Sequence, residues 1–316
     1  GEVTCTGKLE YEAIARSVIK DLGYTNPVFN FHFADSPISI FIHEQSPDIA
    51  VGVDGGGAGD QGIMFGYACN ETPELMPLPI ILSHRLAEGI DRARETEKLP
   101  YLRPDGKTEV TIIYENGKPK AVEQVVLAVP HDPKVSPKQV LTDLYRNVVT
   151  EVLGKYGFKV NKKNIILNGT GKWEIGGPHS DTGVTGRKII VDTYGGMGQH
   201  GGGCFSGKDP SKVDRSGAYA CRFLAKNIVA AGLADRAEVK VAYVIGKEKP
   251  IEKDIETFDT EKVTKKEIFK FADKLLDLSI SSLFEKLNLR QPIYRETAAY
   301  GHFGRNGFSW EVVVGK

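Results

Sequence analysis

The sequence predicts a protein of the α/β or α+β class, and three observations lead to this prediction. Apolar segments of helical period alternate along the chain with short segments rich in β-branched residues. The dipeptide Asn116-Gly117, a strong signal for a two-residue hairpin turn, separates two such short segments. Two helices begin with a capping sequence, at Ser136 and at Thr264. Because helices, strands and a hairpin are mixed, we expect helices packed on sheets.

The N-terminal part of the chain predicts one helix, one strand and one break. Apolar residues keep helical spacing over Leu9–Leu22, and Gly23 is placed to end that helix. Ile38–Ile42 is a short apolar run typical of a buried strand. The glycines of Gly52–Gly62 then predict a break.

The middle of the chain predicts a hairpin, a helix and a strand. Thr108–Tyr114 and Ala121–Val129 are the two expected strands of the hairpin. A helix follows, with Ser136 as its N-cap, Pro137 in its first position and Gln139 completing a capping box. Gly154 ends that helix, and the strand Asn164–Leu167 comes next.

The C-terminal part continues the alternation. Lys188–Val191 is expected to be a strand, followed by a long helix over Ser216–Leu233. Val239–Ile245 alternates as a strand. A further helix runs from Thr264 to Leu276, with Thr264 and Glu267 forming its capping box.

Composition excludes several kinds of partner. The chain has 316 residues, of which 41% are hydrophobic and 26% charged, and its formal net charge is zero. We therefore expect no general attraction to nucleic acid or to an anionic membrane, and no apolar run is long enough to cross a bilayer. The four cysteines are scattered without a CxxC pair, which argues against a zinc site or a disulfide framework and predicts a reducing, cytoplasmic location.

The segment Gly195–Asp214 carries the strongest functional signal. A glycine-rich stretch, which includes glycines at 195, 196, 201, 202 and 203, is followed by Lys208, Lys212 and Asp214, just before the long helix. Glycines allow backbone amides to approach a ligand, two lysines about one helical turn apart supply cations, and a carboxylate suits a divalent metal. The pattern predicts a polyphosphate-binding loop that is neither a Walker A sequence nor GxGxxG. A flexible surface loop is the alternative.

Three other glycine-rich motifs have a structural and a functional interpretation. In Gly57–Gly62, Asp60 either contacts a ribose or a base, or caps a following helix. In Leu102–Lys107, the charges either bind a ligand or lie in solvent at a turn. Gly176–Lys188 is either a ligand loop or a polar connection between domains. The histidines lack the HxxxH spacing of metal ligands, and we interpret His302 as a packing or interface residue.

These motifs resemble those of the S-adenosylmethionine synthetases (methionine adenosyltransferases). They occur in that family's order over nearly the whole chain, and GAGDQG and GGG-x-FSGKDPSKVDR are highly specific. The matching segments are Glu44–Ile49, Gly57–Tyr67, Leu102–Lys107, Gly176–Gly196, Gly201–Arg215, Ala225–Asp235 and Glu296–Gly304. The resemblance implies three similar α/β domains in a pseudo-threefold arrangement, with mixed sheets covered by helices on one face. We expect 1–55 to be a remnant of the N-terminal domain, 56–173 the central domain and 174–316 the C-terminal domain.

The resemblance also implies a reaction. The sulfur of L-methionine attacks C5′ of ATP, the triphosphate leaves, and it is then cleaved to phosphate and diphosphate. Catalytic roles on the triphosphate fall to Lys208, Lys212, Arg187 and Lys107. The ATP-binding residues implied are Asp60, Asp105, Lys107, Trp173, Arg187, Lys188, Lys208 and Lys212, with Trp173 stacking on adenine. Those implied for methionine are Glu2, Gln45, Asp181 and Lys212.

Cofactors and assembly follow from the same resemblance. It implies Mg²⁺ held by Asp214, a requirement for K⁺, and a homodimer with active sites between subunits, assembled into a homotetramer. The family's opening segment, Gly-His-Pro-Asp-Lys, is not found in this chain, which aligns from Gly1-Glu2 onward. An alternative interpretation is therefore a non-catalytic relative that binds nucleotide or a partner subunit.

Overall fold

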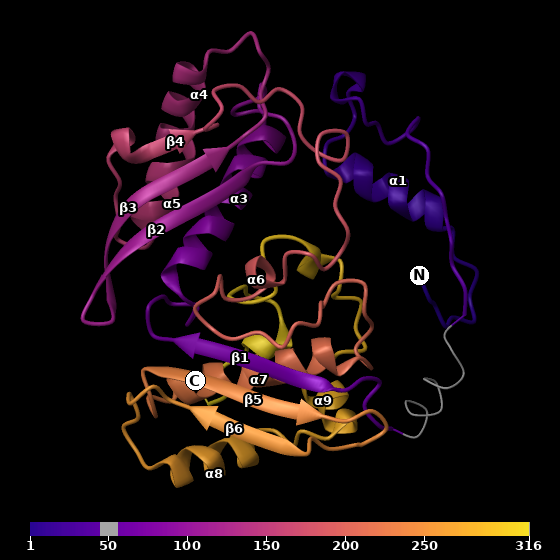
Figure 1. Cartoon of the computed structure of the whole chain (residues 1–316), viewed down its shortest axis with the longest axis vertical. Coiled ribbons are helices and arrows are strands. Elements are labelled where there is room, and N and C mark those ends of the chain that lie inside the picture. Colours follow the sequence, from indigo (N-terminus) through magenta and orange to yellow (C-terminus); the bar gives the residue numbers. More distant parts are fainter. Residues whose placement is uncertain (45–55, 316) are drawn as a thin grey trace. The chain divides into compact units, whose positions relative to one another are not determined.

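The computed structural model describes residues 1–44 and 56–315, and the chain divides into two compact units (Figure 1). One unit comprises Gly1–Gln45 with Leu82–Gly183, and the other comprises Ser46–Ile81 with Val184–Lys316. The helix α3 (Leu78–Glu95) begins in the second unit and continues into the first. Both units combine a three-stranded sheet with helices, so the predicted mixture of helices and sheets is confirmed.

The first unit contains a mixed sheet of order β2-β3-β4. Strands β2 (Lys107–Glu115) and β3 (Lys118–Ala128) form the antiparallel hairpin, and β4 (Ile165–Leu167) pairs parallel to β3. Asn116 and Gly117 have φ angles of 52° and 72°. Because a type I′ turn needs positive φ at both central residues, the predicted hairpin turn is confirmed.

Figure 1 shows α3, α4 and α5 of this unit on one side of the sheet. The predicted helix after Ser136 consists of α4 (Pro137–Leu144), the π-helical turn η2 (Tyr145–Val149) and α5 (Thr150–Lys155). The hydroxyl of Ser136 accepts a hydrogen bond from the backbone nitrogen of Gln139 at 3.3 Å, as expected. The second half of the expected capping box is wrong, because the side chain of Gln139 donates to the Asp143 carboxylate at 2.9 Å instead.

The N-terminal residues of this unit follow the prediction only in part. The expected helix forms as α1 (Tyr11–Asp21), and the 3₁₀ turn η1 (Pro27–Phe29) follows it. A second 3₁₀ turn of this unit, η3 (Lys162–Asn164), comes much later in the chain, just before β4. The expected strand Ile38–Ile42 is wrong. Phe41 is 82% exposed, and the nearest pairing is an isolated bridge between Glu2 and His43. The apolar run has no neighbouring strand to form a ladder among the described residues.

The second unit contains the antiparallel sheet β1-β5-β6 with α7 packed against β1 and β5 (Figure 1). Its elements are β1 (Gly62–Cys69), β5 (Arg236–Tyr243), β6 (Glu252–Glu256) and α7 (Val213–Ala230). A Cβ on Gly66 would overlap the backbone at Cys221. Only glycine therefore lets β1 and α7 approach so closely. The sequence predicted α7 and β5, with ends shifted by a few residues, but not β1, β6 or α3.

The other helices of the second unit are short. The expected strand Lys188–Val191 is wrong, because these residues enter the one-turn helix α6 (Ile189–Asp192). A four-residue apolar run does not distinguish strand from helix by its period. The helix α8 (Lys265–Leu275) begins with the predicted reciprocal capping box of Thr264 and Glu267. The remaining elements are α9 (Ile280–Lys286), η4 (Glu296–Ala298) and η5 (Ser309–Glu311).

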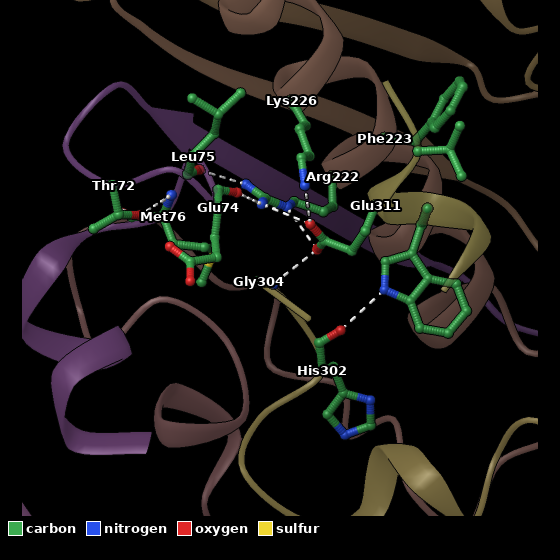
Figure 2. Close-up of polar contacts among 12 residues, drawn as sticks. Thr72, Glu74, Leu75, Met76, Arg222, Phe223, Lys226, His302, Gly304 and Glu311 are labelled. Carbon is green, nitrogen blue, oxygen red and sulfur yellow. Dashed lines mark hydrogen bonds and ion pairs between the residues drawn. The ribbon is translucent and has the colours of Figure 1, made fainter. Parts of the chain in front are cut away.

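A buried charge cluster fastens the C-terminal residues to α7 (Figure 2). The carboxylate of Glu311 lies 2.9 Å from a guanidinium nitrogen of Arg222 and 2.7 Å from Nζ of Lys226. It also accepts from the backbone nitrogen of Gly304 at 2.9 Å. The ring of Trp310 stacks on Tyr219 at 3.8 Å. Trp310 and Glu311 are thereby part of the core of this unit.

Candidate phosphate-binding loops

The loop before α7, residues 205–212, is called the lysine loop below, and its two lysines each pair with a carboxylate. Lys208 pairs with Asp214, and Nζ of Lys212 lies 2.8 Å from the carboxylate of Asp209. Both lysine side chains are about three-quarters buried, at 25% and 22% exposed. Two cations and two carboxylates thus meet where α7 begins, close to its positive end. The arrangement can exchange carboxylate contacts for contacts with an anion.

Glycines bring the neighbouring loop directly onto Asp214. A Cβ on Gly203 would overlap the Asp214 carboxyl group, and a Cβ on Gly201 would overlap the carbonyl oxygen of Ile63. The position of a Cβ on Gly62 lies 3.8 Å from Oδ1 of Asp214. The absence of side chains at these glycines leaves backbone next to the carboxylate.

The GAGDQG motif lies beside the lysine loop. The backbone nitrogen of Gly59 donates to the carbonyl oxygen of Ser211 at 3.3 Å. Ala58 exchanges hydrogen bonds with Gly246 and Lys247, at 2.9 and 2.8 Å. The carboxylate of Asp60 accepts a hydrogen bond from the backbone nitrogen of Gln61 at 2.8 Å. The next element along the chain is the strand β1, not a helix. The helix-capping alternative for Asp60 is therefore wrong, and the two motifs adjoin one another.

The cations Arg187 and Lys188 stand on a segment next to the same loop. A Cβ on Gly186 would overlap the side chain of Cys204, and a Cβ on Gly207 would lie 3.6 Å from Thr185. The segment 185–187 therefore runs alongside 204–207. Both cationic residues are exposed, so their side chains are accessible to an anion from solvent.

A small cavity of about 10 Å³ adjoins Asp214. His200, Gly203 and Phe205 contribute to its wall. Burial lowers the pKa of His200, although the negative charge of Asp214 acts in the opposite direction. Nδ1 of His200 accepts a hydrogen bond from the backbone nitrogen of Gly202 at 2.8 Å. Nδ1 must be unprotonated to accept this bond. A neutral His200 thus helps to hold the glycine loop in place.

The first unit joins two of the other motifs. Asp105, with a φ of 78°, accepts from the backbone nitrogen of Gly177 at 2.8 Å. A Cβ on Gly176 would lie 2.7 Å from the Pro130 ring and 3.0 Å from the Pro104 carbonyl oxygen. The Leu102–Lys107 turn and the start of the Gly176–Lys188 segment are therefore packed together. Asp105 has a bonding partner and is not a free turn charge.

Lys107, Trp173 and Asp181 are also neighbours in this unit. Nζ of Lys107 lies 3.3 Å from the carboxylate of Asp181 and 5.4 Å from the centre of a Trp173 ring. The Lys107 and Asp181 side chains are 54% and 71% exposed. An ion pair this exposed contributes little to stability, so a ligand can replace it at low cost.

The remaining expected site residues are placed differently. Glu2 lies 3.3 Å from His43, and none of the described contacts joins it to Lys107, Trp173 or Asp181. Gln45 lies outside the described residues. Glu2 therefore belongs to a different local cluster, with His43.

The residues around Asp214 fit one mode of metal binding. No group of three potential His, Cys, Asp or Glu ligands occurs among residues 1–44 and 56–315. Mg²⁺ is commonly held by one or two carboxylates, substrate phosphates and water rather than by a protein cage. A single carboxylate beside a glycine loop and two lysines suits this mode, and does not suit a structural metal site.

Sequence reasoning missed the polar partners that hold the lysine loop from behind. Arg215 and His302 are both buried, and Tyr219 contacts both of them. His302 is a packing residue, as interpreted, but it also lies 3.4 Å from Ser206 of the loop. The only signal in the sequence was their place inside two of the motifs, since the contacts of Arg215 with Thr297, and of His302 with Tyr219 and Ser206, join residues 82 to 96 positions apart.

Within the described part of the chain, no helix has both the length and the apolar character needed to cross a membrane. Family models match two parts of the chain: the S-adenosylmethionine synthetase central domain over residues 55–173, and the S-adenosylmethionine synthetase C-terminal domain over residues 175–312.

Curated relatives match almost the whole chain. Proteins named S-adenosylmethionine synthase from Roseiflexus castenholzii and Treponema denticola are 50% and 49% identical to it, over 331 and 320 residues. A protein of the same name from Thermus thermophilus is 48% identical over 326 residues. Each match covers 98% of this chain and 82% of the relative. The chain therefore belongs to the S-adenosylmethionine synthetase family.

Proposed function

We propose that this chain is a methionine adenosyltransferase that makes S-adenosylmethionine, phosphate and diphosphate from ATP, L-methionine and water. The observation that carries the proposal is identity of about 50% to proteins named S-adenosylmethionine synthase over 98% of the chain. The same observation favours catalysis over the alternative of a non-catalytic relative. The adjoining GAGDQG and GKDPSK loops support it from the structure.

The proposed reaction has two parts. The methionine sulfur donates an electron pair to C5′ of ATP, the new S–C5′ bond forms, and the C5′–O bond breaks with its electrons leaving on the triphosphate. Water then cleaves the triphosphate to phosphate and diphosphate. The main physical requirement is to neutralise a polyanionic leaving group and to align sulfur with C5′.

The cations are proposed to act on the triphosphate. Lys208 and Lys212 carry this role at the start of α7, where their carboxylate partners can be exchanged for phosphate oxygens. Arg187 and Lys188 act from the adjacent exposed segment. Lys107 is also proposed to bind the triphosphate. Its ion pair with Asp181 is exposed, so breaking that pair costs little free energy.

Other residues are proposed to bind the two organic parts of the substrates. Trp173 stacks on adenine, and Lys107 already lies over its ring. Asp60 and Asp105 bind ATP, with Asp60 on the ribose or methionine side. Glu2, Gln45, Asp181 and Lys212 are proposed for methionine.

Mg²⁺ and K⁺ are proposed as cofactors. Asp214 would hold Mg²⁺, whose chemistry when bound is to neutralise phosphate charge. The side chain of Lys208 would then be released from Asp214 toward the anion. We assign no residue of this chain to K⁺.

The proposal also includes domain organisation, assembly and location. We propose that residues 1–55 belong to an N-terminal domain, 56–173 to a central domain and 174–316 to a C-terminal domain. We propose a homodimer with active sites between subunits, assembled into a homotetramer, in the cytoplasm. ATP and L-methionine are the proposed small-molecule partners, with no role for nucleic acid or membrane.

Two substitutions test the function. Lys208→Met and Asp214→Asn should each lower the turnover of S-adenosylmethionine synthesis by about 10²- to 10³-fold, because each removes a charge that acts on the leaving group. Lys262→Met is the matched control, since Lys262 pairs with Asp235 in the same unit at 2.6 Å, with a side chain 54% exposed. Circular dichroism should show all three variants folded. Normal kinetics from both site variants, or no product from the unchanged chain, would contradict the proposal.

A further inference from the structure

Arg215 lies directly after Asp214 in the first turn of α7, and it is only 3% exposed. One nitrogen of its guanidinium, Nη1, donates to the carbonyl oxygens of Phe205 at 3.1 Å and Lys208 at 2.8 Å. These two residues also bond to each other, since the Lys208 nitrogen donates to the Phe205 carbonyl oxygen at 3.1 Å. Arg215 therefore holds both ends of the turn that presents Lys208.

The rest of the guanidinium is anchored away from the loop. Nη2 donates to the Thr297 hydroxyl at 2.7 Å, and Nε donates to the Tyr219 hydroxyl at 3.0 Å. The group lies over the ring of Tyr294 at 4.3 Å. With its planar fork fixed on these sides, Arg215 cannot move without breaking several contacts, so it is a rigid support for the turn.

A second polar path returns to the same turn. Burial raises the pKa of the Tyr219 hydroxyl to about 12, although Arg215 lowers it, so the hydroxyl is protonated at neutral pH. Because this oxygen accepts from Arg215, its proton is available for Nδ1 of His302, 2.8 Å away. Nε2 of His302 then lies 3.4 Å from the hydroxyl of Ser206. The turn is supported at Phe205, Ser206 and Lys208.

The charge of Arg215 is compensated differently from that of Arg222, two turns further along α7. Arg222 is paired with the Glu311 carboxylate (Figure 2). Within residues 1–44 and 56–315, the partners of Arg215 are neutral oxygens. A buried guanidinium without a carboxylate is costly if its only role is to fill the core. It suits a position that supports an anion-binding loop.

We propose that Arg215 is a positioning residue, which fixes the backbone of the turn 205–208 and so the direction from which Lys208 reaches a polyphosphate. The nature of the anion rests on the proposed function, whereas the ordering of the turn does not. Arg215 acts through Lys208 and needs no contact with the substrate.

The test compares Arg215→Lys with Arg222→Lys in the full chain. Both substitutions keep the charge and remove the planar fork at a buried position of the same helix. Hydrogen exchange is measured for peptides covering residues 205–212. Calorimetry measures the binding of inorganic tripolyphosphate in the presence of Mg²⁺, and scanning fluorimetry measures the Tm. In Arg215→Lys we expect amide protection of the turn and tripolyphosphate affinity each to fall by about tenfold or more. In Arg222→Lys we expect a lower Tm, with both of these quantities within about twofold of the unchanged chain.

Three results separate the possibilities. Unchanged protection in Arg215→Lys, or an equal loss in both variants, overturns the proposal and leaves Arg215 as a core residue. Loss of protection in Arg215→Lys alone, with no tripolyphosphate binding by the unchanged chain, supports the positioning role and contradicts the proposed function. If Arg215→Lys does not fold, Thr297→Val removes one anchor while keeping Arg215. A smaller loss of protection then supports the role, and unchanged protection overturns it.

Discussion

Glu311→Gln is the substitution that most directly tests how the C-terminal residues are held. Glu311 is buried, and its carboxylate compensates two buried cations, Arg222 and Lys226 (Figure 2). Glutamine keeps the shape and one acceptor oxygen, but it removes the negative charge and points an NH₂ group toward cations. Arg222 would keep three hydrogen bonds to carbonyl oxygens, each 2.8 Å long, so its charge would be solvated only in part.

Removing one partner of a buried ion pair typically costs about 3–5 kcal/mol, because the other charge stays buried and uncompensated. For a unit of this size, 1 kcal/mol corresponds to about 2–4 °C in Tm, so the expected decrease is about 6–20 °C. Calorimetric melting of the unchanged chain and the variant at pH 7 measures it. Asp254→Asn is the control, because Asp254 pairs with Lys240 at 3.4 Å with its side chain 54% exposed. That change should cost less than about 1 kcal/mol.

The pH dependence gives an independent measurement of the same cluster. Burial alone would raise the pKa of Glu311, but Arg222 and then Lys226 outweigh burial and the pKa is lowered from its ordinary value of 4.5. A lowered carboxyl pKa contributes stability that is complete above the unfolded value and is lost as the pH falls through the folded value. The unchanged chain should therefore lose more stability below pH 4.5 than Glu311→Gln does. Equal Tm values for Glu311→Gln and Asp254→Asn, together with parallel pH profiles, would refute this reasoning.

Two further predictions concern the glycine loop and a helix cap. Gly203→Ala should displace the loop from Asp214, because its Cβ would overlap the carboxyl group, and should raise the Mg²⁺ concentration needed for half-maximal synthesis by about tenfold or more. Gly169→Ala is its control, with no atom within 4 Å of the new Cβ, and an equal Mg²⁺ requirement in the two variants would contradict the expectation. Thr264→Ala removes the reciprocal capping box of α8 and should cost about 1 kcal/mol in chemical denaturation. A cost indistinguishable from zero would mean that α8 is held by tertiary packing alone.

Features specified by neighbouring residues could be predicted from the sequence. The Asn116-Gly117 turn needs positive φ at two adjacent positions, and these two residue types tolerate it. The capping box of α8 likewise depends on two residues three positions apart. The grouping of Lys208, Lys212 and Asp214 at the start of the long helix is similarly local, although the pairing of Lys208 with Asp214 and of Lys212 with Asp209 was not predicted.

Features that depend on distant residues were not predictable in this way. Ile38–Ile42 and Lys188–Val191 are short apolar runs, and whether such a run becomes a strand depends on a neighbouring strand rather than on its own period. β1 contains Gly66, which weakens strand propensity and is explained only by the approach of α7. Glu311 bonds to Arg222, 89 residues away, and the anchor of Arg215 at Thr297 is 82 residues away.

Gly66 has a consequence for anyone who transplants or redesigns this unit. The helix it contacts is 18 residues long, which corresponds to about 27 Å. A methyl group inserted between strand and helix would act as a wedge near the middle of that length. Even a small tilt would then be magnified at the end where Lys212 and Asp214 stand. The positions of the charged groups at the start of α7 thus depend in part on Gly66, a residue without a side chain on the strand that packs against this helix.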